Sequence, residues 1–85
     1  MQQETASEKP RLVSATPSDG YKLLLLYNNG ERRVFDASPL MAHKVFAPLA
    51  NKGFFGLVKV EFDTVIWPRD IDYCPDRLYE ESVPY

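Results

Sequence analysis

The stretch "YKLLLLYNNGERRVFDA", residues 21–37, decides the fold because it predicts two antiparallel strands joined by a tight turn. Asn29-Gly30 favours the positive φ angles of a two-residue type I′ turn. This turn pairs Tyr27 with Arg32, Leu25 with Val34, Leu23 with Asp36, Leu26 with Arg33 and Leu24 with Phe35. Both faces of the hairpin carry bulky apolar residues, so alternation alone does not separate core from solvent. We expect the core-facing set to be Leu23, Leu25 and Val34.

A second hairpin is predicted in "GLVKVEFDTVIWP", residues 56–68. A turn at Asp63-Thr64 aligns one apolar stripe toward the core, made of Val58, Val60, Phe62, Val65 and Trp67. Pro68 ends the pairing because it has no amide hydrogen to donate. A further strand, "RLVSAT" at 11–16, precedes the first hairpin, and the turn "PSDG" at 17–20 connects them.

Two short helical segments are predicted where a capping residue precedes proline. Ser38 fits an N-cap with Pro39 at the first helical position, and Pro48 keeps that segment short. Its apolar residues are expected to pack it on the sheet: Leu40, Phe46, Leu49 and Phe54 or Phe55. Cys74 and Pro75 begin the second segment, with Asp76 at the positive end of the helix dipole. Leu78 and Tyr79 are expected to anchor this last segment.

These elements predict an α+β fold, a small two-layer domain in which an antiparallel sheet of about five strands carries two short helical segments. We expect one domain over residues 11–82. Residues 1–10 contain almost nothing to bury and are expected to form a disordered N-terminal tail. Residues 83–85 are expected to form a C-terminal tail.

Composition narrows the function classes. The chain has 85 residues, of which 45% are hydrophobic and 26% charged, and its formal net charge is −2. Its basic residues are scattered rather than clustered, which argues against direct binding of nucleic acid. The longest apolar run, "LLLLY" at 23–27, is too short to cross a membrane, and the first ten residues lack the pattern of a signal peptide. A single Cys fits a reducing cytoplasm.

Across residues 12–80 the chain resembles a family of small, mostly bacterial domains known as domain of unknown function 2442. The most specific residues of this resemblance are Trp67-Pro68, the following Asp72, and Pro75 with Leu78 and Tyr79. The resemblance implies an α+β domain, with no catalytic residues established. Some members precede a helix-turn-helix segment, and others are encoded beside another small protein, an arrangement similar to a toxin–antitoxin pair. Unlike its relatives, this chain has Cys74 as the capping residue and no Gly in "EFDTV".

Candidate chemistry is weak in this sequence. Asp70 and Asp72, with Asp36 and His43, have the atom types of an acid–base or divalent metal site, but D-x-D in a loop is common by chance. The structural alternative is that Asp72 accepts hydrogen bonds from amides at the start of the last helix or in the preceding turn. Cys74 lacks a neighbouring base and is more simply a capping thiol. His43 is most simply a surface residue. We therefore expect no catalytic, cofactor-binding or metal-binding residue.

Two functions remain. We favour a non-enzymatic cytoplasmic domain that binds a protein, either a second copy or a neighbour-encoded partner, by strand pairing at a sheet edge. Its expected partner surface is Tyr21, Tyr27, Arg32 and Arg33, because aromatic residues and Arg are enriched at interface hot spots. The simpler alternative is cross-strand packing of Tyr27 over the stem of Arg32. The second function is regulation at DNA through a helix-turn-helix partner, and a metal-dependent enzyme comes third.

Overall fold

A computed structural model describes residues 10–85, and residues 1–9 of the predicted N-terminal tail lie outside that range. The predicted α+β class is confirmed, but the strands divide into two antiparallel sheets instead of forming one. Sheet A has the strand order β1-β2-β3-β7, with bounds Leu12–Ser18, Lys22–Tyr27, Arg32–Asp36 and Val83–Pro84. Sheet B has the order β4-β5-β6, with bounds Lys59–Glu61, Thr64–Trp67 and Ile71–Asp72.

The first hairpin is shifted by one residue from the predicted register. The Gly30 amide donates to the Tyr27 carbonyl and the Tyr27 amide to the Glu31 carbonyl, both at 3.0 Å. The loop is therefore three residues long, with Gly30 at φ +89° in the last position. A one-residue shift exchanges the two faces of β3. Leu23 and Leu25 are buried as predicted. The prediction that Val34 faces the core is wrong, because Phe35 takes the core position opposite Leu23.

The second hairpin turns at Phe62-Asp63, one residue earlier than predicted. Val60 pairs with Val65, so the stripe of valines with Trp67 does face the core. Phe62 was wrongly included in that stripe and is 84% exposed. Phe62 and Asp63 have φ angles of 53° and 64°, the two positive values that a type I′ turn requires. A bulky aromatic residue is rare in this conformation, so the turn is strained.

Replacing Phe62-Asp63 with Asn-Gly should therefore stabilise the protein. Gly adopts positive φ without steric cost and Asn tolerates it, so we expect the free energy of unfolding to rise by about 1–2 kcal/mol. Urea denaturation followed by circular dichroism measures this change. The control Asp63→Ala removes the carboxylate but keeps the Cβ, and should give no gain. An unchanged midpoint for the Asn-Gly variant would show that the native turn carries no strain.

The segment between the sheets is irregular, as its prolines predict. It comprises the 3₁₀ helices η1 (Ser38–Ala42) and η2 (Lys44–Ala50) and the single turn α2 (Lys52–Phe55). Leu40, Leu49 and Phe55 are buried in the core, and Phe46 and Phe54 pack at its margin, as expected. Ser38 is not the N-cap. The N-cap position is Ala37, and Ser38 rather than Pro39 is the first residue of η1. The hydroxyl and the amide of Ser38 both donate to Asp36 Oδ1, at 2.7 and 3.0 Å.

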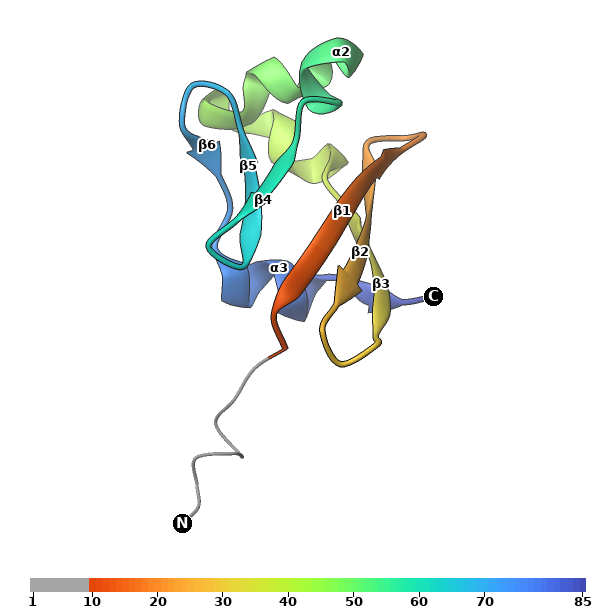
Figure 1. Ribbon diagram of the computed structural model, residues 1–85. Coiled ribbons are helices and arrows are strands. Elements are labelled where there is room, and N and C mark those ends of the chain that lie inside the picture. Colours follow the sequence, from red (N-terminus) through yellow and green to blue (C-terminus); the bar gives the residue numbers. More distant parts are fainter. Residues whose placement is uncertain (1–9) are drawn as a thin grey trace.

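One core lies between the two sheets, with the η1–α2 segment above it and α3 (Pro75–Glu81) below it in the view of Figure 1. Trp67 joins β5 to α2, since its Nε1 donates to the Phe55 carbonyl at 2.9 Å. Leu78 is fully buried and Tyr79 packs at the margin, so both anchor α3 as predicted. Cys74 occupies the N-cap position but is exposed and forms no side-chain cap within the described chain.

The predicted C-terminal tail is the fourth strand of sheet A. Val83 pairs with Val34 and Pro84 with Arg33. The amide of Tyr85 donates to the Arg32 carbonyl at 3.1 Å, which extends the pairing by one residue. The end of the described chain therefore covers the edge of β3.

Candidate functional site

The side of sheet A turned away from the core, called here the outer face, is built from three cross-strand rows. Strand side chains alternate between faces, so the registers assign each residue to a row. The first row is Ser14, Leu26, Arg32 and Tyr85. The second row is Thr16, Leu24, Val34 and Val83. The third row is Ser18, Lys22 and Asp36.

Apolar side chains fill most of the first two rows of the outer face. Leu26, Val83 and Tyr85 are 36%, 55% and 63% exposed, and Leu24 and Val34 are half-buried. A shallow hollow of about 200 Å³ on this face is lined by residues that include Leu24, Leu26, Arg32 and Tyr85. An antiparallel sheet with one solvated face normally turns polar residues outward. A connected set of outward apolar side chains is instead typical of an interaction surface.

Charged residues lie in the first and third rows of the outer face. Arg32 lies in the first row, and Lys22 faces Asp36 in the third. Hydrogen bonds from the Ser38 hydroxyl and amide, together with the charge of Lys22, hold the pKa of Asp36 below its ordinary value. Asp36 is therefore ionised at neutral pH. The outer face thus has a cation at one end of β3 and an anion at the other.

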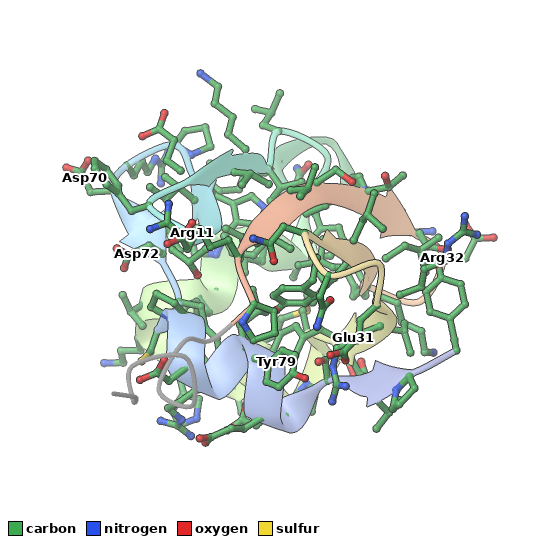
Figure 2. All side chains as sticks on the ribbon, turned by 60° about the horizontal axis from the view of Figure 1, so that its bottom comes forward. Arg11, Glu31, Arg32, Asp70, Asp72 and Tyr79 are labelled. Carbon is green, nitrogen blue, oxygen red and sulfur yellow. The ribbon has the colours of Figure 1, made fainter. Side chains whose placement is uncertain are left out.

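The predicted partner surface of Tyr21, Tyr27, Arg32 and Arg33 does not exist as one surface. The register places Tyr27 and Arg33 on the inner side of sheet A, and Tyr27 is only 3% exposed. Tyr21 is half-buried and donates its hydroxyl to the Ala50 carbonyl. Arg32 alone reaches the outer face, and in Figure 2 it points to the side, well away from Glu31 and Tyr79. The expected packing of Tyr27 over the Arg32 stem is also wrong.

Arg33 instead organises an inner polar cluster, made of Glu31, Arg33, Tyr79 and Ser82. Its guanidinium donates to Ser82 Oγ, to the Ser82 carbonyl and to Glu31 Oε1, at 2.6, 2.8 and 2.9 Å. It also stacks on the Tyr79 ring, with Cζ 4.3 Å from the ring centroid. Within the described chain the buried Tyr27 hydroxyl has no hydrogen-bond partner, and burial raises its pKa to about 12. This cluster fixes the residue before β7.

The titration of Glu31 tests this cluster. Hydrogen bonds, first from Asn29 and then from Tyr79, lower the pKa of Glu31 below its ordinary value. Because the folded pKa is lower than the unfolded one, the stabilisation is present above the unfolded pKa and is lost as pH falls through the folded pKa. Tyr79→Phe keeps the ring and removes the hydroxyl, so it should raise the pKa of Glu31.

Carboxyl ¹³C shifts followed by NMR from pH 7 to pH 2 measure this change. Glu81 serves as the internal control, since the main cause of its lowered pKa is the hydrogen bond from the Tyr73 hydroxyl. The pKa of Glu81 should therefore stay the same in the Tyr79→Phe variant. An unchanged pKa of Glu31 would contradict the contact between Tyr79 and Glu31.

The structure does not gather the candidate acid–base and metal residues. Figure 2 shows Asp70 and Asp72 together at one side of the molecule, opposite Arg32. His43 is an exposed residue between η1 and η2, as the sequence predicts. The carboxylate of Asp36 accepts a hydrogen bond from the Ser38 hydroxyl. Within residues 10–85, no three His, Cys, Asp or Glu side chains are placed to share an ion. Within that range the carboxylate of Asp72 accepts no hydrogen bond from α3 or from the preceding turn, so this structural interpretation is wrong.

Comparison with known protein families confirms the resemblance found in the sequence. A family model described as "Protein of unknown function (DUF2442)" matches residues 12–84. The chain belongs to this family. No curated protein and no solved structure matches it significantly. No described helix of this DUF2442 domain has the length and apolar character needed to cross a membrane.

The residues that carry the resemblance to DUF2442 lie at junctions of the fold. Trp67 and Pro68 end β5, Asp72 ends β6, and Pro75, Leu78 and Tyr79 begin and anchor α3. The outer face was missed because the one-residue shift of the hairpin changes which β3 residues are outward. Its sequence signature was present, however. Leu24 and Leu26 are apolar on the face of β2 that the core does not use.

Proposed function

We propose that this domain is a non-catalytic protein-binding module and that its partner covers the outer face of sheet A. The observation that carries the proposal is the connected apolar set on that face, with polar and charged residues beside it. This arrangement matches an interface with an apolar centre and a polar rim. The set consists of Leu24, Leu26, Val34, Val83 and Tyr85, with Arg32 between Leu26 and Tyr85. Ser14 and Thr16 border it on β1, and Lys22 and Asp36 border it in the third row.

The shape and the charge of this face favour a protein over other ligands. The hollow is shallow and open, whereas small-molecule sites are concave and enclose most of the ligand. Binding to phosphates needs clustered cations, but on this face Asp36 stands opposite Lys22. A partner with apolar side chains and both signs of charge fits these features.

The outer face fits better than the edges of sheet A, although the sequence-based hypothesis relied on strand pairing at a sheet edge. Strand β1 has an irregular register between Leu12 and Ser14 and contains Pro17. On the other side, β7 pairs through only two residues, one of them Pro84. Bulges, prolines and short edge strands are the features by which proteins prevent strand addition. Protein binding therefore uses the side chains of the outer face.

Site-specific photo-crosslinking tests this proposal. A benzophenone amino acid at position 26 should form a covalent adduct in cells of the native host, identified by mass spectrometry. The same group at position 57 is the matched control, because Leu57 is also apolar and 54% exposed but lies outside the outer face. Adding Leu24→Glu should abolish the adduct at 26. Equal labelling from both positions would overturn the proposal.

A further inference from the structure

We propose that the protein bound by the outer face is a second copy of this chain, stacked face to face about a two-fold axis that runs across the strands. This inference rests on the proposed function and names its partner. Two sheets that pack face to face keep their strands roughly aligned. A two-fold axis lets one surface serve both partners, provided that the surface is complementary to itself.

The rows of the outer face have this complementarity. With the axis along the middle row, that row packs on its own copy, and its apolar members are Leu24, Val34 and Val83. The first and third rows exchange places, so Arg32 of one copy lies over Asp36 of the other. Both residues lie on β3, four positions apart and equally distant from Val34. The symmetry therefore forms two opposite-charge contacts.

The other orientation, with the axis along the strands, satisfies fewer charges. It places Lys22 over Asp36 of the second copy, although Lys22 already faces Asp36 of its own chain. Arg32 then lies over Leu26 with no acidic partner. The axis across the strands leaves each Asp36 between its own Lys22 and the Arg32 of the other copy. We therefore assign the axis across the strands.

The size of the face sets the strength of the contact. Three strand spacings of ~4.8 Å and four residues at ~3.4 Å give a face of roughly 14 Å by 14 Å between backbone positions. This is smaller than the ~800 Å² per partner of a standard stable interface. The dimer should therefore be reversible, with a dissociation constant in the micromolar range or weaker.

Charge exchange between two variants tests the geometry. Arg32→Asp gives a homodimer with two acid–acid contacts, and Asp36→Arg gives one with two base–base contacts. Each variant alone should dimerise at least about tenfold more weakly than the native chain, as seen by sedimentation equilibrium over a range of concentrations. An equimolar mixture should regain the native affinity, because both contacts then join opposite charges. Lys44→Asp, an exposed change on η2, should leave dimerisation unchanged.

The mixture also controls for folding. Asp36 accepts two hydrogen bonds from Ser38, so Asp36→Arg is expected to weaken the start of η1. If a folding defect in Asp36→Arg were the reason for its weak dimerisation, the mixture would also dimerise weakly, because it contains that variant. Recovery of affinity in the mixture therefore shows that the charge contacts are responsible. Recovery with Lys22→Asp in place of Arg32→Asp would overturn the assigned axis. A native chain that stays monomeric at millimolar concentration would overturn self-association. Position-26 adducts with a different protein would then leave protein binding through this face intact.

Discussion

Replacing Trp67 with Ala is expected to lower the free energy of unfolding by about 3–5 kcal/mol. The indole is only 1% exposed and stacks on Phe55, with ring centroids 5.8 Å apart. Its removal leaves a cavity between sheet B and α2, and it also leaves the Phe55 carbonyl without its donor. A domain of this size has a total stability of about 4–11 kcal/mol. The variant should therefore lose a large part of its stability and unfold at a markedly lower temperature than the native chain.

Thermal unfolding followed by far-UV circular dichroism checks this expectation. Trp67→Phe is the matched control, because it keeps a buried ring and removes the hydrogen bond to Phe55. It should cost less, about 1–3 kcal/mol. A Trp67→Ala variant as stable as Trp67→Phe would show that the indole does not hold α2 on sheet B.

Replacing Arg33 should have the second largest effect. Its side chain is 13% exposed and holds Glu31, Tyr79 and Ser82 together. Arg33→Met keeps the aliphatic stem but leaves the Ser82 carbonyl and the Glu31 carboxylate without this donor, at a cost of about 2–3 kcal/mol. Lys should not restore the loss, because one ammonium cannot reproduce the planar fork that reaches three oxygen atoms.

The loss should be local as well as global. Ser82 directly precedes β7, so we expect faster hydrogen exchange at the Tyr85 amide, which bonds to the Arg32 carbonyl. Arg77→Met is the matched control, since the Arg77–Glu81 pair is exposed at 64% and 41% and should contribute less than about 1 kcal/mol. If both variants lose the same stability, the inner polar cluster does not hold the last strand.

The α+β class and most core positions were predictable because they depend on local alternation. Leu23, Leu25, Val65 and Trp67 occupy alternate positions in apolar strands and are buried. The register was less predictable, since Asn29-Gly30 fits either a two-residue loop or a three-residue loop with Gly last. The choice between these loops decides whether Val34 or Phe35 enters the core. The second turn was misplaced because Phe62 adopts a conformation that its side chain disfavours.

The remaining differences come from contacts between distant parts of the chain. Nothing local in "SVPY" indicates that Val83 pairs with Val34, and no local pattern divides the strands into two sheets. The inner position of Arg33 has the same origin. It depends on Ser82 and Tyr79, which approach only after α3 packs below the sheets. The candidate site was only partly predictable for the same reason. The apolar content of the first hairpin was evident from the sequence, but which of its residues face outward was not.

The late position of β7 in the sequence has a consequence for folding order. Strands β1 to β3 are linked by short turns, whereas β3 and β7 are separated by the whole of sheet B and α3. Closing such a long loop costs more entropy, so β7 should dock last and detach first. When it detaches, the backbone of β3 is open to the same segment of a neighbouring molecule. Conditions that loosen α3 are therefore those under which domain swapping or aggregation should begin.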